Sequence, residues 1–133
     1  MTQIKAAFFD IDGTLLPFQA KALPESTVQA LAALRKNGVK TFIATGRPPV
    51  HLPYLHALDG IPFDGYVTLS GQYCFAGDRV LRKNPMPPQA VEELVAAAGD
   101  DAFSCIFLEG EDIYLNCIND LTRAFMKDLN LPL

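Results

Sequence analysis

The sequence predicts an α/β protein built on a parallel sheet and followed by a smaller α+β unit. Three short apolar runs have the length of buried strands, at residues 4–9, 39–44 and 65–70. Helix-forming stretches separate these runs, which is the pattern of strands joined by right-handed crossovers. The character of the chain changes after residue 70, where a hairpin signal and then a second set of elements begin.

The first helix is expected over residues 25–36. Val28, Leu31 and Leu34 recur at three-residue steps there, which is the spacing of one helix face. Two starts fit equally well: a capping box formed by Ser26 and the glutamine three residues later, or Pro24 in the first turn. An Asn-Gly pair at residues 37–38 is expected to end the helix.

A second helix is expected after the strand at residues 39–44. It would carry Leu52, Leu55 and Leu58 on one face. Proline cannot donate the backbone hydrogen bond that a helix interior needs, so this helix is expected to begin only at Pro53.

The rest of the chain predicts a hairpin and then a separate unit. Two short strands, 72–75 and 79–81, flank an Ala-Gly-Asp turn. A proline-rich stretch follows at residues 84–88, and we place a domain boundary there, giving residues 1–83 and residues 84–133. The second part is expected to contain a helix, two strands and a helix, at residues 89–98, 103–108, 113–118 and 120–129.

Composition narrows the range of functions. The chain has 133 residues, 15 acidic and 11 basic, and a net charge of −4, and no more than two basic residues are adjacent. A nucleic-acid partner is therefore not expected. No apolar run is long enough for a membrane span. The three cysteines, an odd number without a Cys-x-x-Cys pair, favour free thiols in a reducing cytoplasm. Oligomeric state stays open.

Two acids follow the first strand, Asp10 and Asp12. In an open α/β sheet, ligands bind outside the carboxyl ends of the strands. Two carboxylates there repel one another unless a cation is present, and Mg²⁺ prefers such oxygen ligands. Gly13 allows a tight turn, Thr14 offers a hydroxyl, and the loop amides can bind an anion. The alternative without a function is a solvent-exposed acidic turn, and an Asp-x-Asp sequence by itself would favour that interpretation.

The longer motif is more specific. Residues 8–16, Phe-Phe-Asp-Ile-Asp-Gly-Thr-Leu-Leu, resemble the first motif of the haloacid dehalogenase-like phosphatases. Thr45, Gly46 and Arg47 resemble the second motif of the Cof-like sugar-phosphatase branch. The resemblance continues through the turn at Ser70 and Gly71 and the hairpin. It implies a Rossmann-like core with an inserted α+β cap, of which the helix-strand-strand-helix run would be the first half, both being incomplete in this chain.

The resemblance also implies roles for the first-motif residues. Asp10 would be the nucleophile that becomes an aspartyl-phosphate, and its carboxylate would bind Mg²⁺. Asp12 would be the general acid and base, with its backbone carbonyl on the metal. The backbone amides of Ile11 and Gly13 would help to hold the phosphoryl oxygens.

The second motif and the turn after the third strand would complete the phosphate site. Thr45 and the Gly46 amide would hold the transferring oxygens, and Arg47 would lie near the phosphate or its leaving group. Ser70 and Gly71 would contact the substrate at the position where that branch usually has Asn-Gly, and Ser70 offers a shorter side chain with a hydroxyl in place of the amide. The implied activity is the hydrolysis of a small phosphorylated metabolite, with a sugar phosphate as the first expectation.

Two of the family's four motifs have no counterpart in these 133 residues. The third-motif lysine and the fourth-motif acidic pair follow the cap, and Lys127 and Asp128 read as a solvated helix face. We therefore expect this polypeptide to be inactive or very weak alone and to be part of a longer protein. A phosphomutase of the same family and a non-catalytic phosphate-binding or regulatory module are the alternatives. A reading frame that continues past the last residue with those motifs would favour the enzyme.

The two histidines are not expected to bind metal. His51 and His56 lie five residues apart, which is neither a helical neighbour spacing nor a usual zinc spacing.

Overall fold

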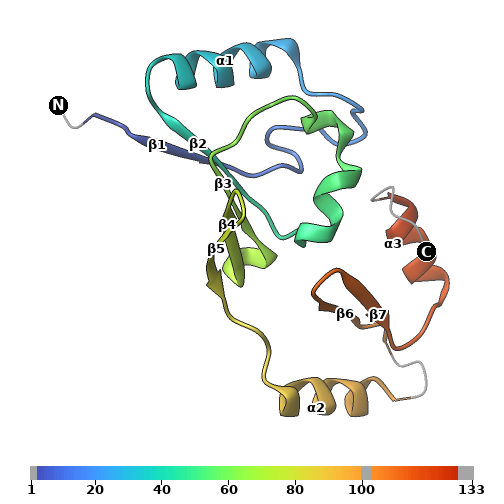
Figure 1. The fold of residues 1–133 in the computed structure, drawn as a ribbon. Coiled ribbons are helices and arrows are strands. Elements are labelled where there is room, and N and C mark those ends of the chain that lie inside the picture. The colour runs from blue at the N-terminus through green and yellow to red at the C-terminus, as the bar shows by residue number, and fades with distance from the viewer. Residues whose placement is uncertain (1–2, 100–102, 129–133) are drawn as a thin grey trace. The chain divides into compact units, whose positions relative to one another are not determined.

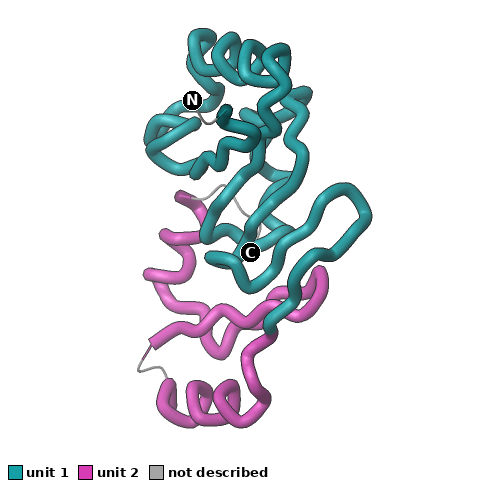
Figure 2. Tube along the Cα trace, turned by 90° about the vertical axis from the view of Figure 1, so that its left-hand side faces the viewer, with its two compact units in different colours: residues 1–84 teal, residues 85–133 magenta. Residues whose placement is uncertain are grey.

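The computed structural model describes residues 3–99 and 103–128. The chain divides into two compact units, Met1–Asn84 and Pro85–Leu133, which Figure 2 shows in different colours. Each unit has its own secondary structure and is described by itself.

The first unit is built on one five-stranded sheet. Its strands follow chain order, and Figure 1 labels them β1 (Ala6–Phe9), β2 (Lys40–Ala44), β3 (Gly65–Thr68), β4 (Tyr73–Ala76) and β5 (Arg79–Lys83). β1, β2 and β3 pair in parallel, whereas β4 and β5 are antiparallel. The predicted α/β class with its parallel strands is therefore confirmed. The hairpin is a continuation of the same sheet.

Helix α1 spans Glu25–Lys36, as the periodicity predicts. Its start differs from both expectations, because Pro24 is the residue that precedes the first turn and the capping box is not formed. The Gln29 side chain donates to the Glu25 carboxylate at 3.0 Å. Pro24 has an extended ψ of 141°, and its carbonyl accepts the amides of Thr27 and Val28. Pro24 therefore lies just before the helix and accepts its first backbone hydrogen bonds.

The second predicted helix is wrong. Residues Pro49–Tyr54 and His56–Leu58 form two short 3-10 turns, closed by bonds such as His51 N–H to Pro48 C=O at 3.1 Å and Leu55 N–H to Leu52 C=O at 3.0 Å. Pro53 explains the difference, since it has no N–H and its ring obstructs the carbonyl four residues earlier. The tighter turn still packs Leu52, Leu55 and Leu58 against the core.

One hydrophobic core holds the strands, α1 and these turns together. Its buried members are Ile11, Leu15, Leu23, Leu31, Ile43 and Leu55. Side chains alternate along a strand, so neighbouring residues of β1 and β2 point to the opposite side. There Phe8 and Phe42 stack with their ring centroids 4.8 Å apart, and Phe8 remains 58% exposed.

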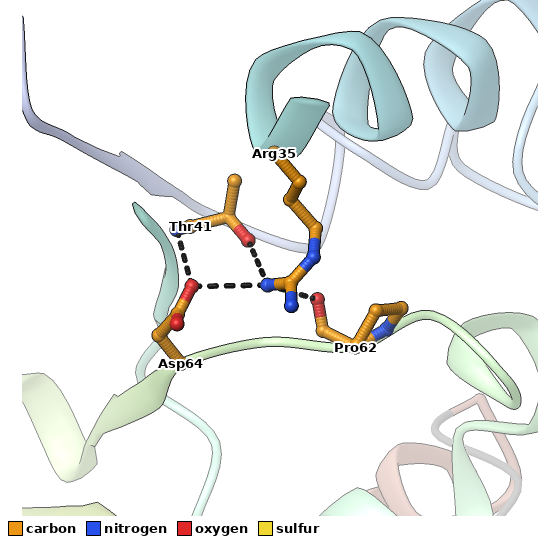
Figure 3. A network of polar contacts seen from close by, with 4 residues as sticks. All are labelled: Arg35, Thr41, Pro62 and Asp64. Carbon is orange, nitrogen blue, oxygen red and sulfur yellow. Dashed lines mark hydrogen bonds and ion pairs between the residues drawn. The ribbon is translucent and has the colours of Figure 1, made fainter. Parts of the chain in front are cut away.

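Polar contacts tie α1 to the amino ends of β2 and β3 (Figure 3). Asp64 accepts from the Arg35 guanidinium at 3.0 Å and from the Thr41 amide at 2.9 Å. Arg35 also donates to the Pro62 carbonyl at 3.3 Å. This network lies at the end of the parallel strands opposite the candidate site.

The second unit contains α2 (Pro88–Ala98), β6 (Ile106–Glu109), β7 (Asp112–Leu115) and α3 (Asp120–Asp128). This element order agrees with the prediction, and the last residue of the predicted fourth element, residue 129, lies outside the described residues. Both strands are shorter than predicted. Asn116 accepts from the Cys105 amide at 2.6 Å and donates to the Phe103 carbonyl at 3.0 Å. The Asn116 side chain thus bonds backbone groups of Cys105 and Phe103 that would pair with the other strand if β6 and β7 were longer.

The cysteines are free thiols, as predicted. Among the described residues, none of the helices has the length and apolar character that crossing a membrane requires.

Candidate active site

The loop that follows β1 carries both acids of the first motif. Its backbone is closed by bonds from the Leu16 amide to the Ile11 carbonyl at 2.9 Å and from the Gly13 amide to the Leu16 carbonyl at 2.8 Å. Ile11 and Leu15 are buried and anchor the loop in the core, whereas Asp10 is exposed. The sequence alternates buried and polar residues here, so the two carboxylates reach the surface from a fixed loop.

Gly13 is required by the shape of this loop. Its φ is +79°, a left-handed value that favours glycine, and a Cβ there would lie 2.8 Å from the Phe18 ring. Its amide already donates to Leu16, so the Gly13 amide would have to leave that bond to contact a bound phosphate. Thr14 is exposed in the same loop.

The residues after β2 form the second part of the site. Thr45 is buried, its amide donates to the Val67 carbonyl at 2.9 Å, and its hydroxyl accepts from the Arg47 amide at 3.1 Å. Gly46 is exposed beside it. The loop is therefore fixed on one side by β3 and presents Gly46 and Arg47 at the carboxyl end of the sheet.

The turn after β3 lies against this loop. Ser70 N–H donates to the Thr45 carbonyl at 3.2 Å, and Leu69 N–H donates to the Arg47 carbonyl at 3.1 Å. The Ser70 hydroxyl oxygen is 3.7 Å from the position of a Cβ on Gly46. Three successive residues have left-handed φ values, 50° at Leu69, 52° at Ser70 and 95° at Gly71. A run that includes two non-glycine residues is strained, and such strain is often found at functional sites.

An ion pair joins the first and second motifs. Arg47 donates from Nε to Asp12 Oδ2 at 2.8 Å and from Nη2 to Asp12 Oδ1 at 2.7 Å. Both carboxylate oxygens are engaged in this bidentate contact, which is the strongest form of such a pair. The Arg47 side chain is 11% exposed and that of Asp12 is 38% exposed. The positive charge of Arg47 is therefore largely shielded from water, whereas the Asp12 carboxylate beside it is partly open to solvent.

Oxygen donors of the kind that Mg²⁺ takes are present in these loops. The Asp12 carboxylate is occupied by Arg47, which leaves the exposed Asp10 carboxylate and the Asp12 backbone carbonyl as the groups that would hold the ion. In the part of the chain that the structure describes, no cluster of three or more His, Cys, Asp or Glu side chains could hold a metal. Mg²⁺ usually takes only one or two protein carboxylates and completes its shell with water and phosphate oxygens.

The structure adds His51, to which the sequence pattern assigned no role. Its side chain is 5% exposed and lies in the 3-10 turn that follows Arg47. Burial, and then the nearby Arg47 charge, lower the pKa of His51 below its ordinary value of 6.5. A single histidine among prolines has no periodicity that would reveal burial, so only its closeness to Arg47 in sequence could have signalled it.

Tyr73 and Pro49 line a shallow hollow on the hairpin side of the first unit. The other lining residues are Phe75, Gly77, Asp78 and Val80. Pro49 and Tyr73 lie two and three residues from Arg47 and Ser70 in the chain, but no residue of the candidate site lines the hollow.

Comparison with known proteins gives consistent results. Residues 7–130 match the family model of the haloacid dehalogenase-like hydrolases. One curated relative is YkrA of Bacillus subtilis (strain 168), a protein named as a phosphatase, which is 33% identical over 104 residues. That alignment covers 78% of this chain and 39% of YkrA.

Solved structures resemble almost the whole chain. A subclass IIB sugar phosphatase of the haloacid dehalogenase superfamily is 39% identical with a TM-score of 0.88, covering 97% of this chain and 50% of its own. A member of a phosphoryl-transfer superfamily in which a trigonal-bipyramidal intermediate is conserved is 37% identical with a TM-score of 0.87. That match covers 98% of this chain and 51% of the other. The chain thus spans about half the length of these solved relatives.

Proposed function

The chain belongs to the haloacid dehalogenase-like hydrolases, and from this membership we propose that the protein is a Mg²⁺-dependent phosphatase of small phosphorylated metabolites. The observation that carries the proposal is the meeting of two motifs at the carboxyl end of the parallel strands. Asp10 and Asp12 follow β1, Thr45 to Arg47 follow β2, and the Arg47–Asp12 ion pair joins them. Sugar phosphates are the first substrates to test, because a solved relative is a sugar phosphatase.

The proposed reaction has two steps on this chain's own carboxylates. In the first, an Asp10 oxygen attacks phosphorus, the bond from phosphorus to the leaving oxygen breaks, and Asp12 gives that oxygen a proton. In the second, Asp12 takes a proton from water, whose oxygen attacks phosphorus and releases inorganic phosphate and free Asp10. The first step stores the phosphoryl group on Asp10, and the second restores both side chains.

The surrounding groups would position the phosphoryl group and offset its charge. The Thr45 hydroxyl, the Gly46 amide and the Ile11 amide are the proposed hydrogen-bond donors, with Thr14, Ser70 and Gly71 at the edge of the site. When bound at Asp10 and the Asp12 carbonyl, Mg²⁺ would offset the repulsion between the nucleophile and the phosphate. Phosphoryl transfer depends mostly on such positioning and charge stabilisation.

We assign the two units to a catalytic core and to part of an inserted cap, with the boundary at residue 84. A cap in such an enzyme would supply substrate contacts and exclude bulk water, while one water remains for the second step. Two of the family's motifs, a lysine and an acidic pair, have no counterpart here. We therefore expect the isolated 133-residue chain to turn over slowly or not at all.

The test is a phosphatase assay of the protein as its gene encodes it. Sugar phosphates, nucleoside phosphates and p-nitrophenyl phosphate would be assayed with Mg²⁺ and then with excess chelator. Asp10→Asn is expected to lower kcat by about 10³-fold or more, because the nucleophile is lost. Asp59→Asn, which changes an exposed carboxylate paired with His56, is the matched control. Turnover that survives Asp10→Asn would overturn the assignment of Asp10.

The same assay separates the alternatives. A phosphomutase would move phosphate between positions of a sugar without releasing inorganic phosphate, and it would still lose activity with Asp10→Asn. A phosphate-binding module would bind the ligands without turnover. Turnover of ordinary enzyme size by the 133-residue chain would contradict the expectation that it is inactive alone.

A further inference from the structure

The buried His51 ring is a polar group to which the proposed reaction gives no role. Both of its nitrogens are buried, and within residues 3–99 and 103–128 neither has a hydrogen-bond partner. The same is true of Arg47 Nη1, although the other two nitrogens of that guanidinium bind Asp12. Buried polar groups in native proteins are nearly always paired, so two unpaired groups in one region require an explanation.

The two side chains belong to one short piece of backbone. Arg47 ends the second motif, and His51 lies four residues later in the turn closed by its own amide on the Pro48 carbonyl at 3.1 Å. Pro48, Pro49 and Pro53 restrict this backbone, since each has a fixed φ. The turn therefore keeps His51 in a constant place relative to Arg47.

The hydrogen-bonding capacities of the two groups are complementary. An arginine Nη1 carries only donors, whereas a neutral imidazole has one nitrogen with a free lone pair. Burial and the Arg47 charge lower the pKa of His51, so the ring is neutral near pH 7.

We propose that His51 is a positioning residue for Arg47, with its unprotonated ring nitrogen accepting a hydrogen bond from one bridging water that in turn accepts a hydrogen bond from Arg47 Nη1. The inference rests on the proposed phosphatase function, in which Asp12 must release the guanidinium in order to carry a proton. At that moment Arg47 loses the ion pair that orients it, and the His51 contact keeps the guanidinium directed at the phosphate. His51 does not touch the substrate in this arrangement.

Three variants separate a hydrogen-bond role from simple packing. His51→Leu removes the acceptor while filling the space, and His51→Asn and His51→Gln each restore an acceptor near one of the two ring nitrogens. With p-nitrophenyl phosphate, His51→Leu is expected to lower kcat/KM by about 10-fold, the usual cost of losing an orienting partner. The better of the two amide variants is expected to recover most of that loss. Leu52→Ala, in the same turn, is the packing control and is expected to lower the melting temperature more than kcat/KM.

A double-mutant cycle tests whether the two residues act together. In an Arg47→Ala background, His51→Leu is expected to change kcat/KM by less than about 2-fold, because there is no guanidinium left to position. An equal loss in both backgrounds would overturn the proposal. Equal losses for the leucine and both amide variants, in step with lower melting temperatures, would also overturn it.

A spectroscopic readout does not depend on activity. The ring-nitrogen NMR signals of His51 are expected to shift when Arg47 is replaced by Ala, while those of His56 stay in place. His56 is a suitable internal control, because it is exposed and pairs with Asp59 at 3.1 Å. If the wild-type protein has no phosphatase activity, the proposed function fails, but the shift still shows that Arg47 acts on the His51 ring. If the protein is active and the His51 signals do not move, the positioning role is wrong and the phosphatase stands.

Discussion

Arg47 binds both carboxylate oxygens of Asp12, with Nε 2.8 Å from Oδ2 and Nη2 2.7 Å from Oδ1. The contact joins residues 35 positions apart, at the ends of two neighbouring parallel strands. A general acid cannot donate its proton while both oxygens accept from a guanidinium. A phosphate dianion is the natural competitor for Arg47, since it can accept the same paired hydrogen bonds. Substrate binding and release of Asp12 are thus expected to be linked.

Replacing Arg47 should therefore lower activity more than stability. We expect Arg47→Ala to reduce kcat/KM by about 100-fold, the usual cost of losing one donor to a developing charge. Arg47→Lys should be intermediate, because lysine keeps the charge and loses the paired geometry. Steady-state kinetics with p-nitrophenyl phosphate measures both effects. Arg35→Ala is the control, since Arg35 pairs with Asp64 at the opposite end of the strands and should keep its activity. Full activity of Arg47→Ala would refute a role at the site.

The left-handed turn after β3 predicts a stabilising substitution. Ser70 has a φ of 52°, and asparagine adopts such values more readily than serine. We expect Ser70→Asn to raise the free energy of unfolding by about 0.5 kcal/mol through relief of backbone strain. Urea denaturation measures this change. Ser26→Asn, on the exposed surface of α1, is the matched control and should give no gain. A loss of stability at residue 70 would show that the hydroxyl makes a contact of its own.

Much of the fold could be predicted because periodicity reports which face of an element is buried. The apolar runs at β1, β2 and β3 and the spacing of Val28, Leu31 and Leu34 in α1 are local signals of this kind. The turns between residues 49 and 58 could not be predicted in the same way. Leucines spaced by three residues fit an α-helix and a 3-10 turn alike, and only the strain of Pro53 within the folded backbone decides between them.

The candidate site also has one part that the sequence could predict and another part that it could not. That the loops carrying Asp10 and Thr45 lie at one end of the sheet follows from parallel topology, which the sequence predicts. The pairing of Arg47 with Asp12 depends on side-chain rotamers across two loops, for which no local pattern exists. The burial of His51 is equally non-local, because it depends on how the turn packs.

Asp64 is expected to stabilise the first unit more than its ion pair alone would suggest. Its carboxylate accepts from the Thr41 amide at 2.9 Å as well as from Arg35 (Figure 3). Asp64→Ala leaves that amide, on a fully buried residue, without its acceptor, and we expect a loss of about 1–3 kcal/mol in urea denaturation. Arg35→Ala breaks the partly exposed pair and the guanidinium's hydrogen bonds to the Pro62 carbonyl and the Thr41 hydroxyl, but it leaves the bond from the Thr41 amide to Asp64 in place and should cost less than Asp64→Ala. Asp59→Ala, an exposed carboxylate, is the control. Equal losses for Asp64→Ala and Arg35→Ala would contradict the importance of the amide bond.

Acid should destabilise the protein through His51. Because burial and the Arg47 charge lower its pKa in the folded state, the unfolded chain binds a proton more readily below the ordinary value of 6.5. The free energy of unfolding therefore falls as the pH drops through that value, and the fall continues down to the lowered pKa of the folded protein. Above about pH 7.5 both states are neutral at this residue, and the contribution no longer changes.

The measurement is urea denaturation of the wild type, His51→Gln and His56→Gln between about pH 7.5 and about pH 5.5. Glutamine does not titrate, so His51→Gln should lose less stability over this range than the wild type. His56→Gln should follow the wild type at the buried site, because its substitution leaves His51 in place. The carboxylates themselves are the same in all three proteins, so they do not distinguish His51→Gln from the wild type. Parallel curves for the wild type and His51→Gln would mean that His51 takes up its proton as easily in the folded protein as in the unfolded chain.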